Sequence, residues 1–383
     1  MALAATVGAA TTTHAAAEAQ LLIDADTGKV LHAENATYPW YPASVTKIMT
    51  AYVTLRAVKE GRVKLDTLLT VSRNAVAQQP TKMGFKEGTT VTVDNALKMI
   101  MVKSANDVSV VLAEGVGGSI AGFSDLMNAH AKRLGMTQSH FVNPNGLPAE
   151  DQVTSARDMA ILARALIREF PQYDSYWHIS AIRYGKRVFR NYNSLIDRYP
   201  GADGIKTGFI CASGFNLVAS ATRNGKRLIA VVLGSYSSAV RARKAAQLLE
   251  RGFNSAGLSW LTPSLGSVEA LVPVDARPPN LRDEMCGGHR RKPASEDNDE
   301  EEANAADPAS SQALGFSGLK PATEKYVLPA ATSVGETVVV FTGPASKPDT
   351  VDAAASAKPK ARKKRSKSQQ ASSGGSKKKK SAE

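Results

Sequence analysis

The sequence predicts a mixed α/β fold of the α+β kind, an antiparallel sheet sandwiched by helices with a helical subdomain beside it. Three observations lead to this prediction. Strand-length apolar runs occur near the start of the chain and again between residues 205 and 234. Apolar residues at helical spacing recur between residues 44 and 170. A last helical pattern follows the final strand, at residues 241–253.

The strands are predicted from apolar runs separated by turn residues. Residues 20–34 indicate a β-hairpin, because two apolar runs flank the turn-forming residues 24–28. Asn224-Gly225 is a favoured two-residue hairpin turn, so the strands on either side of it should be antiparallel. The expected later strands are 205–210, 216–221 and 228–234.

The helices are predicted from apolar residues three and four positions apart. One helix should begin at Ser44 and stop at Gly61, since glycine ends helices. Two helical stretches are expected between Asp94 and Gly118, with a break near Ser104. Further helices are expected at 119–134, 154–170 and 241–253.

Composition divides the chain into four predicted regions. Residues 18–258 should form the main domain, residues 259–343 a low-complexity, partly structured region, and residues 344–383 a disordered basic tail. A strand or two could form within 326–341. Residues 352–383 hold eleven Lys and Arg against two acids, so this tail supplies most of the net charge of +13.

The first 17 residues form a leader in this prediction. They are rich in Ala and Thr and end in Ala15-Ala16-Ala17, which suits a signal-peptidase site. A basic start is missing and the apolar core is weak, so we interpret the leader as a partly truncated export signal, with a disordered leader as the alternative. The expected location is the periplasm, with peripheral contact to the cell envelope.

Several function classes are excluded by missing patterns. The six histidines show no metal-ligand spacing, and neither a GxSxG elbow nor a phosphate-binding or dinucleotide-binding glycine motif occurs. No metal or other cofactor is therefore expected. Cys211 and Cys286 are too few for a disulfide framework, and two free or buried thiols are favoured over a single bridge.

Three short motifs occur in order along the main domain. They are Ser44-Val45-Thr46-Lys47, Ser104-Ala105-Asn106 and Lys206-Thr207-Gly208. Taken singly, each has a structural explanation: a helix-capping serine with an exposed lysine, a second helix cap, and an edge-strand lysine. The functional signal lies in their order, spacing and setting together.

The first motif suits nucleophilic catalysis. A helical step of three places the Lys47 amine near the Ser44 hydroxyl. A serine needs a neighbouring base, and a lysine can serve only where burial or nearby cations lower its pKa. Ser104 and Asn106 lie at a helix break, where they could relay a proton and bind an amide. Lys206 and Thr207, expected on an exposed strand, could bind a carboxylate, and Gly208 would let a substrate approach closely.

These motifs and their flanks resemble the D-alanyl-D-alanine carboxypeptidases among the low-molecular-mass penicillin-binding proteins. The resemblance covers residues 20–253 and includes the flanks 23–28, 154–158 and 216–221. It implies a serine β-lactamase/transpeptidase-like fold and a catalytic domain at 18–258. It also implies peptidoglycan stem peptides ending in D-Ala-D-Ala as substrates and β-lactams as acylating inhibitors.

The resemblance further implies a role for each motif residue. Ser44 would be the nucleophile, Lys47 its base, Ser104 a proton relay, and Asn106 an orienting residue. Lys206 and Thr207 would hold the terminal carboxylate of the substrate beside Gly208, and the backbone N–H of Phe209 would join that of Ser44 in an oxyanion hole. The run Phe209-Ile210-Cys211 departs from the threonine that often follows the third motif in this family.

Rival interpretations fit less well. A class A β-lactamase would need a glutamate for deacylation, and Glu150 does not lie in the expected ExxLN pattern. A transpeptidase or endopeptidase on the same fold stays open. A non-catalytic wall-binding protein is disfavoured by the intact Ser44, Lys47 and Lys206. The basic tail lacks the aromatic residues that stack on bases, so no nucleic acid is expected, and electrostatic contact with the envelope is preferred.

Overall fold

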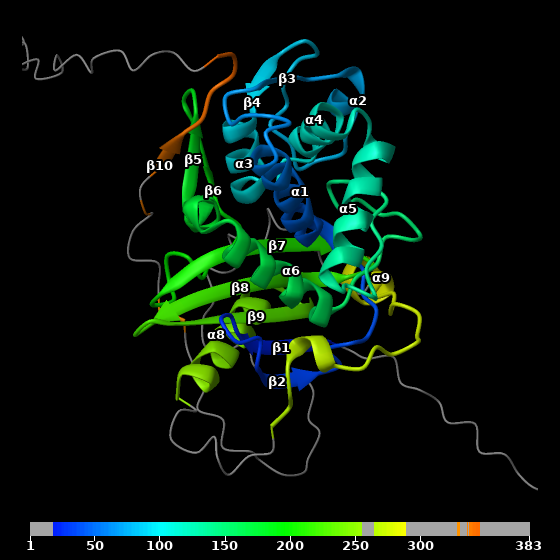
Figure 1. Ribbon diagram of the computed structural model, residues 1–383, viewed down its shortest axis with the longest axis vertical. Helices are drawn as coiled ribbons and strands as arrows, with labels where there is room; N and C mark the ends of the chain where they lie inside the picture. Colours follow the sequence, from blue (N-terminus) through cyan, green and yellow to red (C-terminus); the bar gives the residue numbers. More distant parts are fainter. Residues whose placement is uncertain (1–17, 255–263, 289–327, 330–334, 336, 345–383) are drawn as a thin grey trace, which may run out of the picture. The chain divides into compact units, whose positions relative to one another are not determined.

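The computed structural model describes residues 18–254, 264–288, 328–329, 335 and 337–344. The predicted leader and the predicted tail beyond residue 344 lie outside the described residues. The main sheet has five strands in the order β2-β1-β9-β8-β7, and each neighbouring pair is antiparallel (Figure 1). Its strands are β1 (Ala19–Asp24), β2 (Val30–Glu34), β7 (Ala202–Ile210), β8 (Gly214–Arg223) and β9 (Lys226–Ser235).

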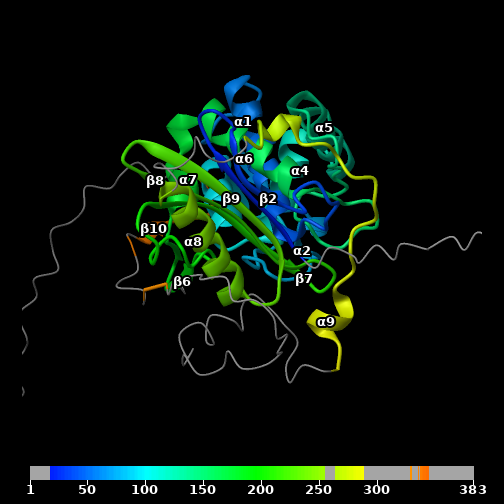
Figure 2. The same ribbon diagram turned by 90° about the horizontal axis from the view of Figure 1, so that it is seen from below.

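Helices cover both faces of this sheet because side chains alternate between the faces along each strand. In β1, Leu21 and Ile23 enter one hydrophobic core and Leu22 enters the other. Helix α6 (Ala156–Glu169) packs on the first face, and α8 (Ser238–Asn254) packs on the second (Figure 2). The predicted helix–sheet–helix sandwich is therefore confirmed.

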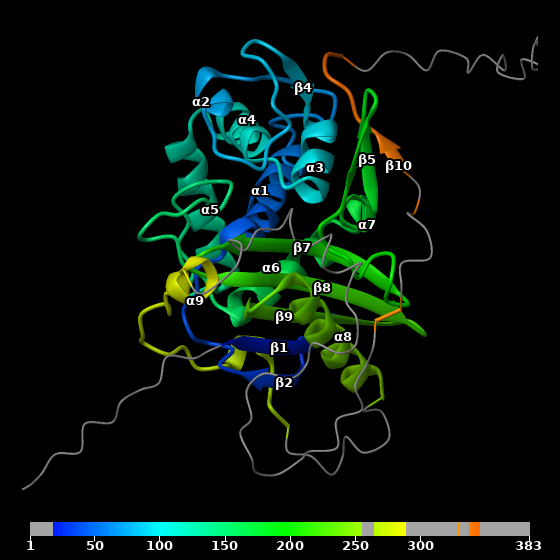
Figure 3. The ribbon, with the colours of Figure 1, turned by 180° about the vertical axis from the view of Figure 1, so that it is seen from behind.

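A helical lobe stands along the β7 edge of the sheet (Figure 3). Its central helix α1 is buried over most of its length. Side-chain caps explain where two of the helices begin: Thr92 accepts from the Asn95 amide, and Ser119 accepts from the Gly122 amide. The lobe contains α1 (Lys47–Lys59), β3 (Leu68–Thr70), α2 (Arg73–Val76), β4 (Thr90–Thr92), α3 (Val93–Val102), α4 (Asn106–Gly117) and α5 (Ile120–Leu134).

A separate three-stranded sheet, in the order β10-β5-β6, packs against the lobe. The turn η2 (Pro171–Tyr173) and α7 (Ser175–His178) lead into a hairpin of β5 (Ala181–Tyr184) and β6 (Arg187–Arg190). The late strand β10 (Thr337–Val339) pairs with β5 in parallel and lies within the segment where a strand was expected. The hairpin itself was not predicted, because Arg and Lys side chains interrupt its apolar alternation.

Residues 264–288 follow the surface of the same unit and contain the turn η4 (Val268–Ala270) and helix α9 (Arg282–Cys286). The Leu281 amide donates to the Ala212 carbonyl at 3.0 Å, and Cys286 forms a disulfide with Cys211. The expectation of two free or buried thiols is wrong. The cysteines are 75 positions apart, and only the docking of α9 on the β7–β8 turn brings their Cα atoms to 5.7 Å.

No single helix of the described residues is long and apolar enough to cross a membrane. Helices α4 and α5 reach the length and apolar composition of a membrane span only when taken together, and the pair is bent by 81° between them. The expected boundary near residue 258 stays a prediction, although residues 264–288 contact the main domain directly.

Candidate active site

The first motif lies where the chain enters the helical lobe. Ser44 belongs to the 3-10 turn η1 (Ala43–Thr46), which leads into α1, so the α-helix begins at Lys47 rather than at the serine. The Lys47 side chain is fully buried, and its Nζ donates to Ser44 Oγ at 3.0 Å and to Asn106 Oδ1 at 2.8 Å. A third bond, of 2.6 Å, reaches the carbonyl of Asn145. The alternative of an exposed, structural lysine is therefore wrong.

Two glycines hold the serine turn in a tight space. Ala43 has a positive φ of 49°, which is costly for a residue with a side chain. A Cβ atom on Gly146 would stand 1.8 Å from the Ala43 carbonyl oxygen, and one on Gly208 would stand 2.7 Å from the Ser44 amide nitrogen. The loop at Gly146 and strand β7 thus contact the turn so closely that neither position has room for a side chain.

Asn216 on β8 fixes the entry to this turn. Its Nδ2 donates to the carbonyls of Tyr41 and Pro42 at 2.9 and 3.1 Å, while its Oδ1 accepts from the Gly234 amide. The side chain is fully buried, so all these bonds are made away from water. Asn216 therefore joins the sheet to the segment that carries the nucleophile candidate.

The second motif occupies the predicted break between α3 and α4. Ser104 has a φ of 60°, and both Ser104 and Asn106 are buried. Asn106 Nδ2 donates to the Gln79 carbonyl at 2.9 Å, so its Oδ1 is oriented toward Lys47. The hydroxyl of Thr81 donates to the Ser104 carbonyl at 3.0 Å, so the loop that contains Gln79 and Thr81 holds both Ser104 and Asn106 in place.

The third motif lies on β7, the edge strand that faces the lobe. Lys206 and Thr207 are each only 1% exposed, so the expectation of an exposed strand is wrong at this point. Strand β7 has no hydrogen-bonded neighbour on that side in the main sheet, but turn η1 packs against it and covers it. Lys206 Nζ donates to the Thr207 carbonyl at 3.0 Å.

A cavity of about 270 Å³ opens where the motifs meet, and we call it the motif pocket. Four predicted site residues line it: Ser44, Ser104, Asn106 and Phe209. The remaining four lie next to these residues. Lys47 is hydrogen-bonded to Ser44, and Gly208 lies against the Ser44 amide. Lys206 and Thr207 precede Gly208 on β7. The rest of the lining is Pro80, Thr81, Gly146, Leu147, Tyr192 and Ile210.

Sequence reasoning missed several residues of the site. Asn145 is one of them, since its carbonyl binds Lys47 from 98 positions away. Tyr192 and Thr81 also line the motif pocket, and neither carries a motif of its own. The run Asn143-Pro144-Asn145-Gly146 is typical of a turn, and it was the one clue in the sequence, since loops often carry functional residues.

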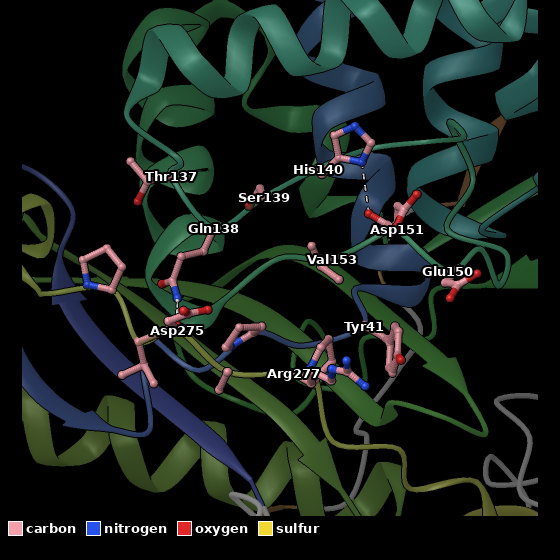
Figure 4. Close-up of a pocket in the computed structure, with 15 residues that line it drawn as sticks. Tyr41, Thr137, Gln138, Ser139, His140, Glu150, Asp151, Val153, Asp275 and Arg277 are labelled. Carbon is pink, nitrogen blue, oxygen red and sulfur yellow. Dashed lines mark hydrogen bonds between the residues drawn. The ribbon is translucent and has the colours of Figure 1, made fainter.

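A larger hollow, of about 1000 Å³, shares no lining residue with the motif pocket (Figure 4). It is lined by Tyr41, His140, Glu150 and Arg277 among others, and by none of the eight predicted site residues. Glu150 thus faces this hollow and does not line the motif pocket, which argues against a role in deacylation. Within the described ranges, no group of three His, Cys, Asp or Glu side chains could hold a metal ion.

A helix-covered antiparallel sheet, with a half-buried Ser44 hydrogen-bonded to the buried Lys47, fits the class of penicillin-recognising serine proteins. The chain matches the D-alanyl-D-alanine carboxypeptidase family, Peptidase S11, over residues 5–237, and it belongs to that family. DacC, a D-alanyl-D-alanine carboxypeptidase of Escherichia coli K12, is 39% identical over 244 residues, which cover 62% of this chain and 61% of DacC. The chain thus spans about three fifths of the length of such relatives.

Solved structures show the same fold. Penicillin binding protein 5 from Haemophilus influenzae matches with a TM-score of 0.60 and 34% identity, over 64% of this chain and 72% of that one. Penicillin-binding protein D2 from Listeria monocytogenes, in its cefotaxime bound form, matches with a TM-score of 0.57 and 28% identity, over 63% of this chain and 98% of that one. The predicted fold and family are confirmed.

Proposed function

We propose that this chain is a serine-type D-Ala-D-Ala carboxypeptidase, which removes the terminal D-alanine from peptidoglycan stem pentapeptides and so limits cross-linking during cell wall biogenesis. One observation carries the proposal. The buried Lys47 amine lies 3.0 Å from Ser44 Oγ. The pair lies where the helical lobe contacts β7, the strand that carries Lys206, Thr207 and Gly208. A base within hydrogen-bond reach of a hydroxyl is what acyl transfer to serine requires.

Acylation would begin with proton transfer from Ser44 Oγ to an unprotonated Lys47. The serine oxygen then attacks the carbonyl of the penultimate D-alanine, and a tetrahedral intermediate forms. Ser104 would pass a proton to the leaving amine, so that the C–N bond breaks and D-alanine departs. Asn106, which already contacts Lys47 at 2.8 Å, would orient the lysine and the substrate amide.

The strand side of the site would bind the substrate and the developing charge. Lys206 and Thr207 would hold the terminal carboxylate of the peptide. The amides of Ser44 and Phe209 would donate to the oxyanion, as preorganised N–H groups do in acyl-transfer enzymes. Gly208 supports this assignment, because its missing side chain lets β7 approach the Ser44 amide.

Water would then hydrolyse the acyl-enzyme and release a tetrapeptide stem. A β-lactam would acylate the same serine, and the cefotaxime and ampicillin bound forms of the Listeria protein support this inference. We place the enzyme in the periplasm, as an exported protein whose basic tail, residues 344–383, contacts the envelope electrostatically. The Cys211–Cys286 disulfide supports an oxidising compartment.

The test is incubation of the protein with a peptide ending in D-Ala-D-Ala, with D-alanine measured over time. Wild type should release D-alanine, and Ser44→Ala should not. After penicillin treatment, peptide mapping by mass spectrometry should place the adduct on the peptide that contains Ser44. An adduct elsewhere would remove Ser44 from its role, and a dominant transfer product with an added amine would indicate a transpeptidase instead.

A further inference from the structure

A second groove lies between the β5–β6 hairpin and the loop that follows α2. We call it the basic groove; it has a volume of about 570 Å³. Figure 1 shows the hairpin beside the helical lobe, with β10 along its outer edge. The groove is lined by Met83, Gly84, Phe85, Lys86, Thr89, Tyr184, Gly185, Lys186, Arg187, Phe189 and Thr342.

The lining of the basic groove has one sign of charge. Lys86, Lys186 and Arg187 are exposed cations, and the lining includes no acidic residue. The neighbouring Glu87 pairs instead with Arg73 at 3.6 Å. Among the residues that the structure describes, the three lining cations have no ion-pair partner. They are therefore available to an anionic ligand.

The floor of the basic groove is aromatic. Phe85 and Tyr184 meet edge to face, with ring centroids 5.3 Å apart. Phe189 adds a third ring from β6. Such a floor offers flat apolar area for peptide side chains and backbone, while the cations around it select the charge of what binds.

One loop contributes residues to both the basic groove and the motif pocket. Pro80 and Thr81 line the motif pocket, and the same loop lines the basic groove from Met83 to Thr89. The Lys103 ammonium lies over two rings, 5.6 Å from the centroid of Phe189 in the groove and 5.1 Å from that of Tyr192 in the motif pocket. A peptide held at Ser44 could thus extend along this loop into the groove.

From this geometry we infer that the basic groove binds carboxylate groups of the peptide whose D-Ala terminus lies in the motif pocket. The ligand is an acidic peptide segment, recognised by Lys86, Lys186 and Arg187 over the aromatic floor. The inference rests on the proposed function and adds a charge preference to it. The groove residues act on substrate binding and take no part in bond breaking.

The experiment compares two peptides of equal length that end in D-Ala-D-Ala. One carries free side-chain carboxylates, and the other carries the corresponding amides. The groove variant is Lys86→Gln/Lys186→Gln/Arg187→Gln. The matched control is Lys132→Gln/Arg168→Gln/Arg243→Gln, which removes three exposed cations from other elements and gives the same net charge.

We expect wild type to have the lower KM for the acidic peptide, with the advantage shrinking as salt rises. The groove variant should raise that KM roughly tenfold, leave its kcat unchanged, and leave the KM for the amide peptide within about twofold. The control variant should keep the wild-type preference. Melting temperatures of all three proteins check that the fold is intact.

Three results would overturn the inference. The groove and control variants could shift KM equally, which would reduce the effect to long-range charge. Both peptides could be cleaved equally well by wild type. A sulfated polysaccharide could bind Ser44→Ala through the groove cations while the acidic peptide does not, which would assign the groove to an anionic polymer. If wild type releases D-alanine from neither peptide, the proposed function fails rather than the groove.

Discussion

The two walls of the motif pocket are built in different ways. The helical wall comprises Ser44, Lys47, Ser104 and Asn106. Hydrogen bonds from the Lys47 amine join it to Ser44, to Asn106 and to the Asn145 carbonyl, and Thr81 holds the Ser104 carbonyl. The strand wall, residues 206–209, is held by the backbone ladder to β8, by the close approach of Gly208 to turn η1, and by the disulfide just beyond it.

This difference predicts how each wall responds to amino-acid substitutions. On the helical wall, the loss of one side chain leaves buried partners unpaired, so the effect spreads to its neighbours. On the strand wall, most side chains are not needed to hold the backbone in place. We therefore expect substitutions in the helical wall to affect chemistry as a group, and changes to the strand wall to act separately on binding and on stability.

The largest effect is expected for Lys47→Met, which keeps the length of the side chain and removes the amine. Acylation of Ser44 by penicillin should slow by about 10³-fold, because a positioned general base contributes on that scale. Stopped-flow or mass-spectrometric acylation rates measure this. Lys64→Met, at an exposed position, is the control. A Lys47→Met protein that is acylated at the wild-type rate would show that another group takes the serine proton.

Lys206→Ala should come next and should affect binding selectively. With the ammonium gone, kcat/KM for a free-acid peptide should fall by about 10²-fold, since a buried charged contact of this kind is worth roughly 2–3 kcal/mol. The C-terminal amide of the same peptide lacks the carboxylate and should be affected far less. Equal losses on both peptides would assign Lys206 to the chemistry of the helical wall instead.

Loss of the disulfide should change stability more than turnover. Cys211→Ala/Cys286→Ala removes a cross-link between residues 75 positions apart. For such a loop we expect a loss of about 2–4 kcal/mol in the free energy of unfolding. Because the β7 ladder remains, kcat/KM should fall less than about tenfold. Denaturant unfolding of oxidised and reduced wild type, alongside the variant, measures the first effect. A tenfold or greater loss of kcat/KM with the fold intact would contradict this view of the strand wall.

The smallest effect concerns the amino-terminal end of β7, outside the motif pocket. There Arg227 on β9 pairs with Asp174 at 2.8 Å and with Asp203 at 3.2 Å. Burial opposes ionisation of Asp174, but hydrogen bonds from His178 and Arg227 and their charges lower its pKa to about 2. A lowered pKa gives stability that is complete above pH 4 and is lost as the pH falls toward 2.

After allowance for solvent screening, this contribution is about 1–2 kcal/mol. Asp174→Asn should flatten the acid limb of the stability profile between pH 4 and 2 and leave penicillin acylation at pH 7 within about twofold. Thermal unfolding across this pH range provides the measurement. An acid limb as steep in Asp174→Asn as in wild type would show that other carboxyls control acid stability.

The periodic parts of the chain were predictable from the sequence, and the contacts between distant parts were not. Helices such as α6 and the β8–β9 hairpin have strong local signals, and the three motifs were located before their contacts were known. The burial of Lys206 could not be predicted, because the covering turn η1 lies far away in the chain. The same holds for the carbonyl of Asn145 at Lys47 and for the Cys211–Cys286 bridge. The catalytic roles of the motif residues remain predictions.

The late strand β10 also constrains the order in which the protein can be completed. Thr337 pairs with Ala181, so a chain that emerges amino terminus first presents β5 with an open edge until β10 has been made. Unpaired edges invite pairing with other chains. The bridge to Cys211 likewise waits for Cys286. Translation products that stop before Thr337 would contain all three motifs but would leave the β5 edge unpaired. A protease or chaperone could recognise such incomplete chains by this exposed strand edge.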